Sequence, residues 1–210
     1  GITSEDIIGA KLGRERLPLA MILGTDALHK GEETSYTRKG IIHFGDADGN
    51  NGEREEAIAE FFTRTGVGFA LESDMKRMFW YKYMMNVSVN QVTAVLRIPY
   101  GAIQSNGASC EIKEARFLIE KAMREVIAVA NAEGIGLSES DIESSFGILD
   151  QLGAENFTSM CQDVLAGRKT ELEMFSPVVM ELARKHGIFT PVVETLYLQL
   201  RVIERRLLNA

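Results

Sequence analysis

Apolar residues follow two different periods along the chain. Up to residue 72 they form short runs between turn residues, which is typical of brief strands with a helix among them. The predicted elements are a strand at Leu19–Leu23, a hairpin of residues 35–38 and 41–44 around Lys39 and Gly40, a helix over residues 53–65 and a strand over residues 67–71. From residue 73 onward apolar residues recur at helical spacing. We therefore predict a mainly α protein, with a small α+β region over residues 1–72 and a helical region over residues 73–210.

Capping and turn residues mark where the helices of the second region begin and end. The first helix should run over residues 74–97 and a second over residues 109–133, each ended by the proline or glycine that follows. Ser138 and Asp141 have capping-box spacing for a third helix ending near residue 153, and residues 156–166 form a fourth. Later starts are a capping box at Thr170-x-x-Glu173, Ser176-Pro177, and Thr190-Pro191 before a last helix to about residue 208. This succession predicts a helical bundle.

Composition and charge narrow the class of protein. The chain has 210 residues, 45% hydrophobic and 25% charged, and can build a core without disulfides or a structural metal. A net charge of -7 argues against a nucleic-acid partner, because phosphate binding needs a concentrated basic face. Cys110 and Cys161 lie far apart, and no Cys or His pattern has metal-ligand spacing, so we predict reduced thiols and no metal. No apolar run is long enough for a membrane span and no signal peptide is recognisable, so we expect a cytoplasmic protein without a membrane partner.

A polar stripe interrupts the most apolar helix. Lys82, Asn86 and Asn90 are spaced i, i+4 and i+8 within residues 78–90, so they share one face of an α-helix. A lysine or asparagine inside an apolar helix needs polar partners or water. The stripe therefore indicates either an internal hydrogen-bond network or a cleft that binds a ligand.

A second polar cluster follows the fourth helix. It contains Asn156, Ser159, Asp163 and Glu171. Glu171 should lie in the first turn of a helix, where the helix dipole favours a carboxylate, and Asp163 could simply pair with Arg168 or Lys169. The cluster by itself fits both a good helix start and a catalytic carboxylate.

Three motifs in order carry a resemblance to a known family. They are Lys82-x-x-x-Asn86-x-x-x-Asn90 followed by Thr93-Ala94, then Ser159-Met160-x-Gln162-Asp163 with Thr170-Glu171, and finally Gly187-Ile188-x-Thr190-Pro191. With them the chain resembles the ketopantoate reductase family (2-dehydropantoate 2-reductase) over essentially its whole length. The resemblance implies that residues 73–210 form a helical substrate-binding and dimerisation domain of the 6-phosphogluconate dehydrogenase C-terminal type. It also implies that residues 1–72 are the end of a Rossmann-type nucleotide-binding domain.

The resemblance further implies an activity and roles for individual residues. The reaction would be reduction of the 2-ketone of ketopantoate to pantoate by NADPH, in pantothenate and coenzyme A biosynthesis, by a homodimer. Lys82 would donate the proton, and burial on an apolar helix would lower its pKa. Glu171 would be the catalytic carboxylate that orients the ammonium, holds the substrate hydroxyl and touches the cofactor. The substrate-binding residues would be Ser159 for the carboxylate, and Asn86, Asn90 and Asn156 for the other oxygens.

The chain lacks the family's glycine-rich phosphate loop. Residues 45–52 are rich in glycine but match neither Gly-x-Gly-x-x-Gly nor an EF-hand, so a polar turn is expected there. Gly1 looks like the glycine of an Asn-Gly pair found in the family, which would place the cofactor-binding residues upstream of Gly1. The chain alone is then expected to be inactive. The alternatives are a non-catalytic helical dimerisation or ligand-binding module and a reductase of a related 2-keto acid.

Overall fold

The computed structural model describes residues 2, 4–25, 28–30, 32–36, 39–105 and 112–208. The chain forms two compact units, Ile2–Phe79 and Trp80–Ala210, and the division falls within helix α3 (Met75–Met85). Gly1 and Cys110, which the sequence analysis singled out, lie outside the described residues.

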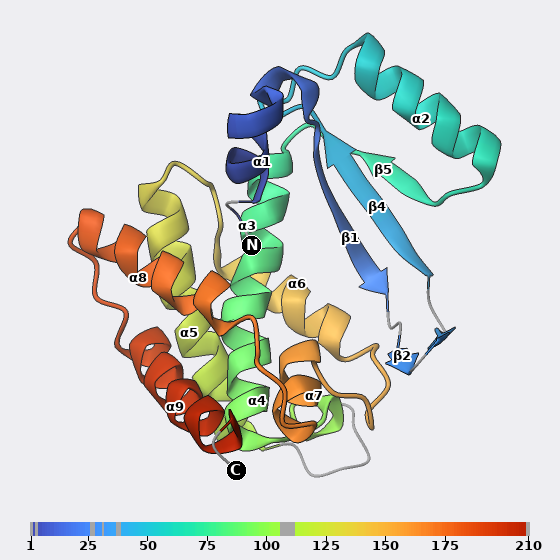
Figure 1. Ribbon diagram of the computed structural model, residues 1–210. Helices are drawn as coiled ribbons and strands as arrows, with labels where there is room; N and C mark the ends of the chain where they lie inside the picture. The colour runs from blue at the N-terminus through green and yellow to red at the C-terminus, as the bar shows by residue number, and fades with distance from the viewer. Residues whose placement is uncertain are drawn as a thin grey trace. The chain divides into compact units, whose positions relative to one another are not determined.

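The described residues of the first unit form a three-stranded sheet, a two-stranded sheet and two α-helices, besides the start of α3. Its elements are α1 (Ser4–Leu12), a 3-10 turn (Arg14–Arg16), β1 (Leu19–Thr25), β2 (Leu28–Lys30), β3 (Glu33–Ser35), β4 (Lys39–Gly45), α2 (Glu53–Thr65) and β5 (Phe69–Leu71). The sheet order is β1-β4-β5, with β1 antiparallel and β5 parallel to β4 (Figure 1). Phe44 packs its ring edge-on against Phe62 of α2 at 5.6 Å between centroids, which fixes this helix on the sheet.

The predicted hairpin around Lys39 and Gly40 is wrong. Both residues lie inside β4, which pairs with β1 in a register that sets Ile42 opposite Ile22. The described residues of 28–35 instead form a separate two-stranded hairpin of β2 and β3. The long pairing is favoured because it buries Leu19 and Phe44, whereas the side chains of β3 are all exposed. A polar turn over residues 46–51 follows β4, as expected, with Asn51 Oδ1 accepting from the Asp46 amide at 2.8 Å.

The second unit is a helical bundle. After α3 come a π-helical segment (Asn86–Asn90), α4 (Gln91–Leu96), a 3-10 turn (Tyr100–Ala102), α5 (Lys113–Ala132), α6 (Glu139–Leu149), α7 (Ser159–Leu165), a 3-10 turn (Leu172–Met174), α8 (Ser176–Lys185) and α9 (Pro191–Leu208). The π segment and α4 contact α5, α7 and α9 (Figure 1). Completely buried apolar residues, among them Val87, Val92, Ile119, Met123 and Leu200, form the core. The predicted fold class, mainly α with a small α+β part, is confirmed.

The expected continuous α-helix over residues 74–97 is interrupted. Residues 86–90 have π-helical hydrogen bonding, and the helix ends at Arg97 with a left-handed φ of 55°. The Ser88 hydroxyl donates to the Met84 carbonyl at 2.6 Å, and the Thr93 hydroxyl donates to the Val89 carbonyl at 2.8 Å. Hydroxyls that bond to carbonyls one turn back disturb the regular helix. A period of 3.6 residues in the sequence cannot reveal such a local widening.

The predicted helix starts had mixed outcomes. The capping box of Ser138 and Asp141 is present, whereas the one at Thr170 and Glu173 does not form, because only a 3-10 turn follows. Ser176 is no cap, since its hydroxyl donates to Gln91 Oε1 at 2.7 Å. The fourth helix begins at residue 159 instead of 156, and the third ends at 149 instead of near 153.

Candidate active site

All six candidate site residues lie in the helical unit, and Lys82 is the chemically most unusual of them. It follows the buried Tyr81 on α3 and precedes the buried Tyr83. Burial lowers the pKa of Lys82 below its ordinary value of 10.5, and the negative charge of Glu171 partly offsets that shift by favouring the ammonium. A lysine with a lowered pKa is a better proton donor near neutral pH than an exposed one.

Glu171 is exposed, although the sequence places it between two residues that are buried. Thr170 and Leu172 point into the bundle, and Glu171 immediately precedes the 3-10 turn at Leu172–Met174. The prediction that Glu171 lies in the first turn of an α-helix is therefore wrong. The structure brings its charge close enough to act on Lys82. A nearby carboxylate that favours the charged form of an ammonium helps to keep its proton available for transfer.

Asn86 and Asn90 begin and end the π segment. Asn90 Nδ2 donates to Asn86 Oδ1 at 3.4 Å, and both side chains are half-buried. The structure therefore brings these two amides together, as the predicted stripe required, although the helix between them is wider than an α-helix. π-helical segments are frequent at functional sites because they re-aim side chains within an otherwise regular helix.

Ser159 is the first residue of α7 and Asn156 lies in the segment just before it, and both residues are exposed. Thr158, the helix cap, accepts from the Cys161 amide at 3.3 Å and shares a hydrogen bond of 2.8 Å with Thr93 of α4. This buried pair ties the beginning of α7 to the helix that carries the asparagines, and α7 contacts the π segment. The Asn156 carbonyl accepts from the Tyr100 amide at 2.9 Å, which holds the turn before α7.

Several polar residues that support the candidate site escaped the sequence analysis. The Tyr83 hydroxyl donates to the Phe175 carbonyl at 2.6 Å, and Glu204 of α9 accepts two hydrogen bonds from Thr170. Thr93 and Thr170 belong to the quoted motifs and gave a signal. Tyr83 and Glu204 gave none, because their partners lie 92 and 34 positions away in the sequence.

Two other features carry simpler explanations. Asp163 accepts from Arg168 Nε at 2.9 Å, so the pairing predicted for it is present. Cys161 is buried, and burial raises the pKa of its thiol to about 11, which makes a reactive thiolate unfavourable.

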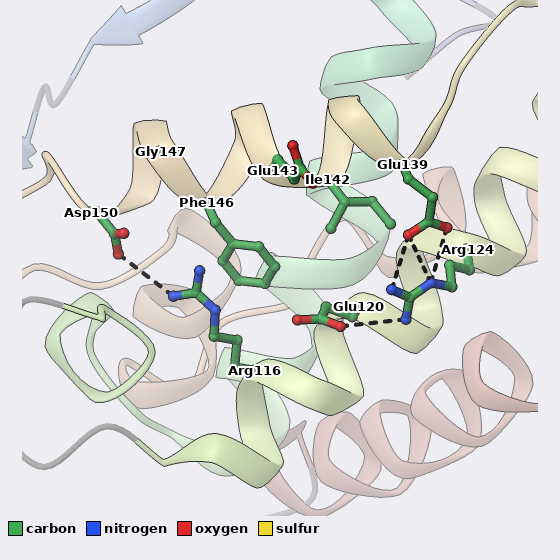
Figure 2. A pocket seen from close by; sticks show the side chains of 9 residues that line it. All are labelled: Arg116, Glu120, Arg124, Glu139, Ile142, Glu143, Phe146, Gly147 and Asp150. Carbon is green, nitrogen blue, oxygen red and sulfur yellow. Dashed lines mark hydrogen bonds and ion pairs between the residues drawn. The ribbon is translucent and has the colours of Figure 1, made fainter.

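A groove of about 430 Å³ lies between α5 and α6 (Figure 2). The Arg116 guanidinium stacks 3.8 Å from the centroid of the Phe146 ring and approaches Asp150 Oδ1 at 3.7 Å. Arg124 binds Glu139 at 3.0 Å. Both arginines thus already have carboxylate partners, and none of the six candidate residues lines this groove.

Two further kinds of feature are absent from the described residues. No helix in the described ranges is both long and apolar enough to cross a membrane. Within the same ranges, no group of three or more His, Cys, Asp or Glu residues could hold a metal ion.

Comparison with known proteins relates this chain and its fold to a known family. Residues 74–204 match the family model described as the C-terminal domain of ketopantoate reductase PanE/ApbA. A 2-dehydropantoate 2-reductase of Halobacterium salinarum is 30% identical over 91% of this chain and 62% of its own length. The crystal structure of a 2-dehydropantoate 2-reductase from Geobacter metallireducens superposes with a TM-score of 0.81 at 26% identity, covering 94% of this chain and 64% of that one. A D-mandelate dehydrogenase complex with NADH has the same fold, with a TM-score of 0.86 at 19% identity, covering 99% of this chain and 68% of that one.

The helical unit is thus a domain of the class found in a family of oxidoreductases. More narrowly, the chain belongs to the ketopantoate reductase family, which confirms the resemblance of its three motifs. It spans about two thirds or less of the length of the curated relatives it matches.

Proposed function

We propose that this chain supplies the substrate-binding and proton-donating part of an NADPH-dependent 2-dehydropantoate 2-reductase, which forms pantoate for coenzyme A biosynthesis. The observation that carries the proposal is the half-buried Lys82, whose pKa burial lowers and Glu171 raises. It occurs on the same helix as the paired amides of Asn86 and Asn90, in a chain of this family. Residues 1–72 would then be the end of the nucleotide-binding domain, and residues 73–210 the substrate-binding and dimerisation domain.

Each candidate residue has a defined part in this reaction. Lys82 Nζ donates a proton to the oxygen of the 2-ketone as that oxygen gains negative charge, and the lysine leaves the step neutral. Glu171 keeps the ammonium protonated before the step and accepts a hydrogen bond from the new hydroxyl. Ser159 binds the substrate carboxylate, while the amides of Asn86, Asn90 and Asn156 donate to the remaining oxygens.

Of the residues in this chain, we assign only Glu171 to the cofactor, at its reacting end. When bound, NADPH supplies the hydride that reaches the carbonyl carbon. The exposed Glu171 carboxylate can accept from an amide or hydroxyl of that group, and no glycine-rich loop for its phosphates occurs in the sequence. For this reason we infer that the chain alone does not turn over substrate. We also infer that the complete enzyme is a cytoplasmic homodimer joined through its helical domains.

The test is NADPH oxidation with ketopantoate, measured on this chain and on the full product of the gene that encodes it. We expect turnover by the full product only. In that protein Lys82→Ala should reduce kcat by about 10²- to 10⁴-fold, because a positioned proton donor contributes that much. An exposed substitution of similar size in the same unit, Glu181→Ala on α8, serves as the control.

Other outcomes separate the alternatives. Oxidation of NADPH with a different 2-keto acid, and none with ketopantoate, would keep the reductase and change the substrate. If the full product binds no nicotinamide cofactor, a non-catalytic helical module is the correct interpretation and the proposal fails.

A further inference from the structure

The segment that carries Glu171 is held at both ends by buried hydrogen bonds. At its C-terminal end, the Tyr83 hydroxyl donates to the Phe175 carbonyl at 2.6 Å and the Ser176 hydroxyl donates to Gln91 Oε1 at 2.7 Å. These contacts fix residues 175 and 176 to α3 and α4. They leave the other end of the segment, next to Glu171, to be held by something else.

Glu204 of α9 holds that other end. Its Oε1 accepts from the Thr170 amide at 2.9 Å and from the Thr170 hydroxyl at 2.7 Å. The Thr170 hydroxyl in turn accepts from the Leu172 amide at 3.2 Å. The residues directly before and after Glu171 are therefore both held by hydrogen bonds. Glu204 is only 5% exposed. Burying a carboxylate is costly, so a glutamate at this position needs a compensating role.

The hydrogen bonds matter because the Glu171 side chain is exposed and gains little restraint from packing. Its position therefore depends on the backbone that Glu204 and Thr170 fix. Glu173 of the same segment also bonds to α9, through Arg201 at 2.6 Å, but these side chains are 47% and 37% exposed. Exposed ion pairs contribute little to stability. The pair of Glu173 and Arg201 therefore serves as a control for the buried contact of Glu204.

We propose that Glu204 is a positioning residue: by holding Thr170, it fixes the backbone of Glu171 and with it the place of the Glu171 carboxylate relative to Lys82. The proposal rests on the proposed function in so far as Lys82 is the proton donor. The hydrogen bonds on which the proposal stands, however, all lie within this chain and do not depend on that function.

The first test measures the titration of Lys82 by NMR of isotope-labelled lysine side chains in this chain. Four variants are compared with the unmodified chain: Glu171→Gln, Glu204→Leu, Glu204→Gln and Glu173→Gln. Glu171→Gln removes the charge that favours the ammonium, so it shows how far the pKa of Lys82 falls without it. Glu204→Leu should lower that pKa in the same direction. Glu204→Gln keeps an oxygen that can accept from Thr170 and should restore the original value, and Glu173→Gln should leave it unchanged.

A purely structural role for Glu204 would change stability without changing this titration. The proposal is therefore overturned if Glu204→Leu folds and Lys82 titrates as in the unmodified chain. It is also overturned if Glu204→Gln and Glu204→Leu shift the pKa of Lys82 equally. In that case the charge of Glu204, and not its hydrogen bonds to Thr170, would influence Lys82. Should Glu204→Leu fail to fold, Thr170→Val replaces it, with Thr170→Ser as the conservative rescue, and the same outcomes decide.

The second test uses the full gene product and its turnover. Glu204→Leu should reduce kcat by up to about 100-fold, as misplacement of a catalytic group can do, and should change KM less. Glu204→Gln should restore most of it. If the pKa of Lys82 falls in Glu204→Leu as expected but the unmodified protein reduces no ketopantoate, the proposed function fails while the positioning role stands. If the unmodified protein reduces ketopantoate but Lys82 titrates unchanged in Glu204→Leu, the proposed function stands and the positioning role fails.

Discussion

Lys82 shows how the role proposed for a residue and the stability of the fold can oppose each other. Burial disfavours its charge, and Glu171 opposes that effect only in part, so the pKa of Lys82 stays below 10.5. Between that lowered pKa and the ordinary one, the unfolded chain binds more protons than the folded chain, and the free energy of unfolding rises with pH. At neutral pH the ammonium therefore costs stability.

The stability of a Lys82→Met variant of this chain tests that cost. Methionine has a similar shape and no charge, so the variant should be more stable at neutral pH by on the order of 1 kcal/mol, in the range typical of such changes. Urea unfolding at neutral pH measures it. The gain should shrink as the pH rises through the lowered pKa of Lys82, because the folded lysine then loses its charge. A less stable variant would mean that the ammonium is stabilised by its surroundings.

The pH dependence of turnover tests the pairing with Glu171. In the proposed mechanism Lys82 must be protonated to act, so kcat of the full gene product should fall as pH rises through the lowered pKa of Lys82, below 10.5. Glu171→Gln removes the charge that raises this pKa, and the alkaline fall should move to lower pH. Glu173→Gln, a neighbouring exposed carboxylate, should leave the profile in place. An unchanged pH profile in Glu171→Gln would show that Glu171 does not influence the protonation of Lys82.

The candidate residues stood out in the sequence more clearly than the residues that surround them in the fold. Lys82, Asn86 and Asn90 stood out because charge and amide groups in an apolar helix are costly, and that cost is local. Glu204 did not stand out, because a glutamate near the end of an amphipathic helix is normally exposed and only the fold shows that it is buried.

At the scale of elements, helix type and order could be predicted, but details that depend on tertiary contacts could not. The capping box of Ser138 and Asp141 forms because both partners are local. Thr170 and Ser176 have cap-like sequences, yet Glu204 and Gln91 use their hydroxyl groups. The π segment is a further case, since hydroxyl bonds to carbonyls one turn back, such as that of Ser88, are not visible in apolar periodicity.

Helix α9 illustrates capping from a distance and gives a prediction at this scale. Glu125 of α5 accepts from the amides of Val192 and Val193 at 2.9 Å each, at the start of α9. Glu125→Ala should lower stability by about 1 kcal/mol, the usual value of a helix cap. Burial raises the pKa of Glu125 above 4.5, so its contribution declines as pH rises through the folded pKa, and the loss should be larger below pH 4.5 than at neutral pH.

Thermal or urea unfolding of the chain measures this loss. Glu181→Ala, an exposed glutamate on α8, is the matched control. Equal stability of Glu125→Ala and Glu181→Ala would show that α9 begins without help from α5.

For the whole molecule, the class was predicted correctly because apolar period and motif order are global properties of the sequence. The strand pairing in the first unit was not, because Leu19–Leu23 and residues 41–44 had to be matched across a connection that contains its own short hairpin. Competing pairings differ mainly in how much apolar surface they bury, which the sequence does not show directly.

Helix α3 belongs to both compact units, and this has a consequence for how the protein unfolds. Melting of either unit would fray the same helix, so the free energies of the two units cannot be independent, and loss of structure should occur in one transition. The chain contains a single tryptophan, Trp80, which packs edge-on against Tyr83 at 5.8 Å just after the division. Its fluorescence and the far-UV ellipticity should therefore change at the same urea concentration. The chain thus carries a spectroscopic reporter on the helix that its two units share.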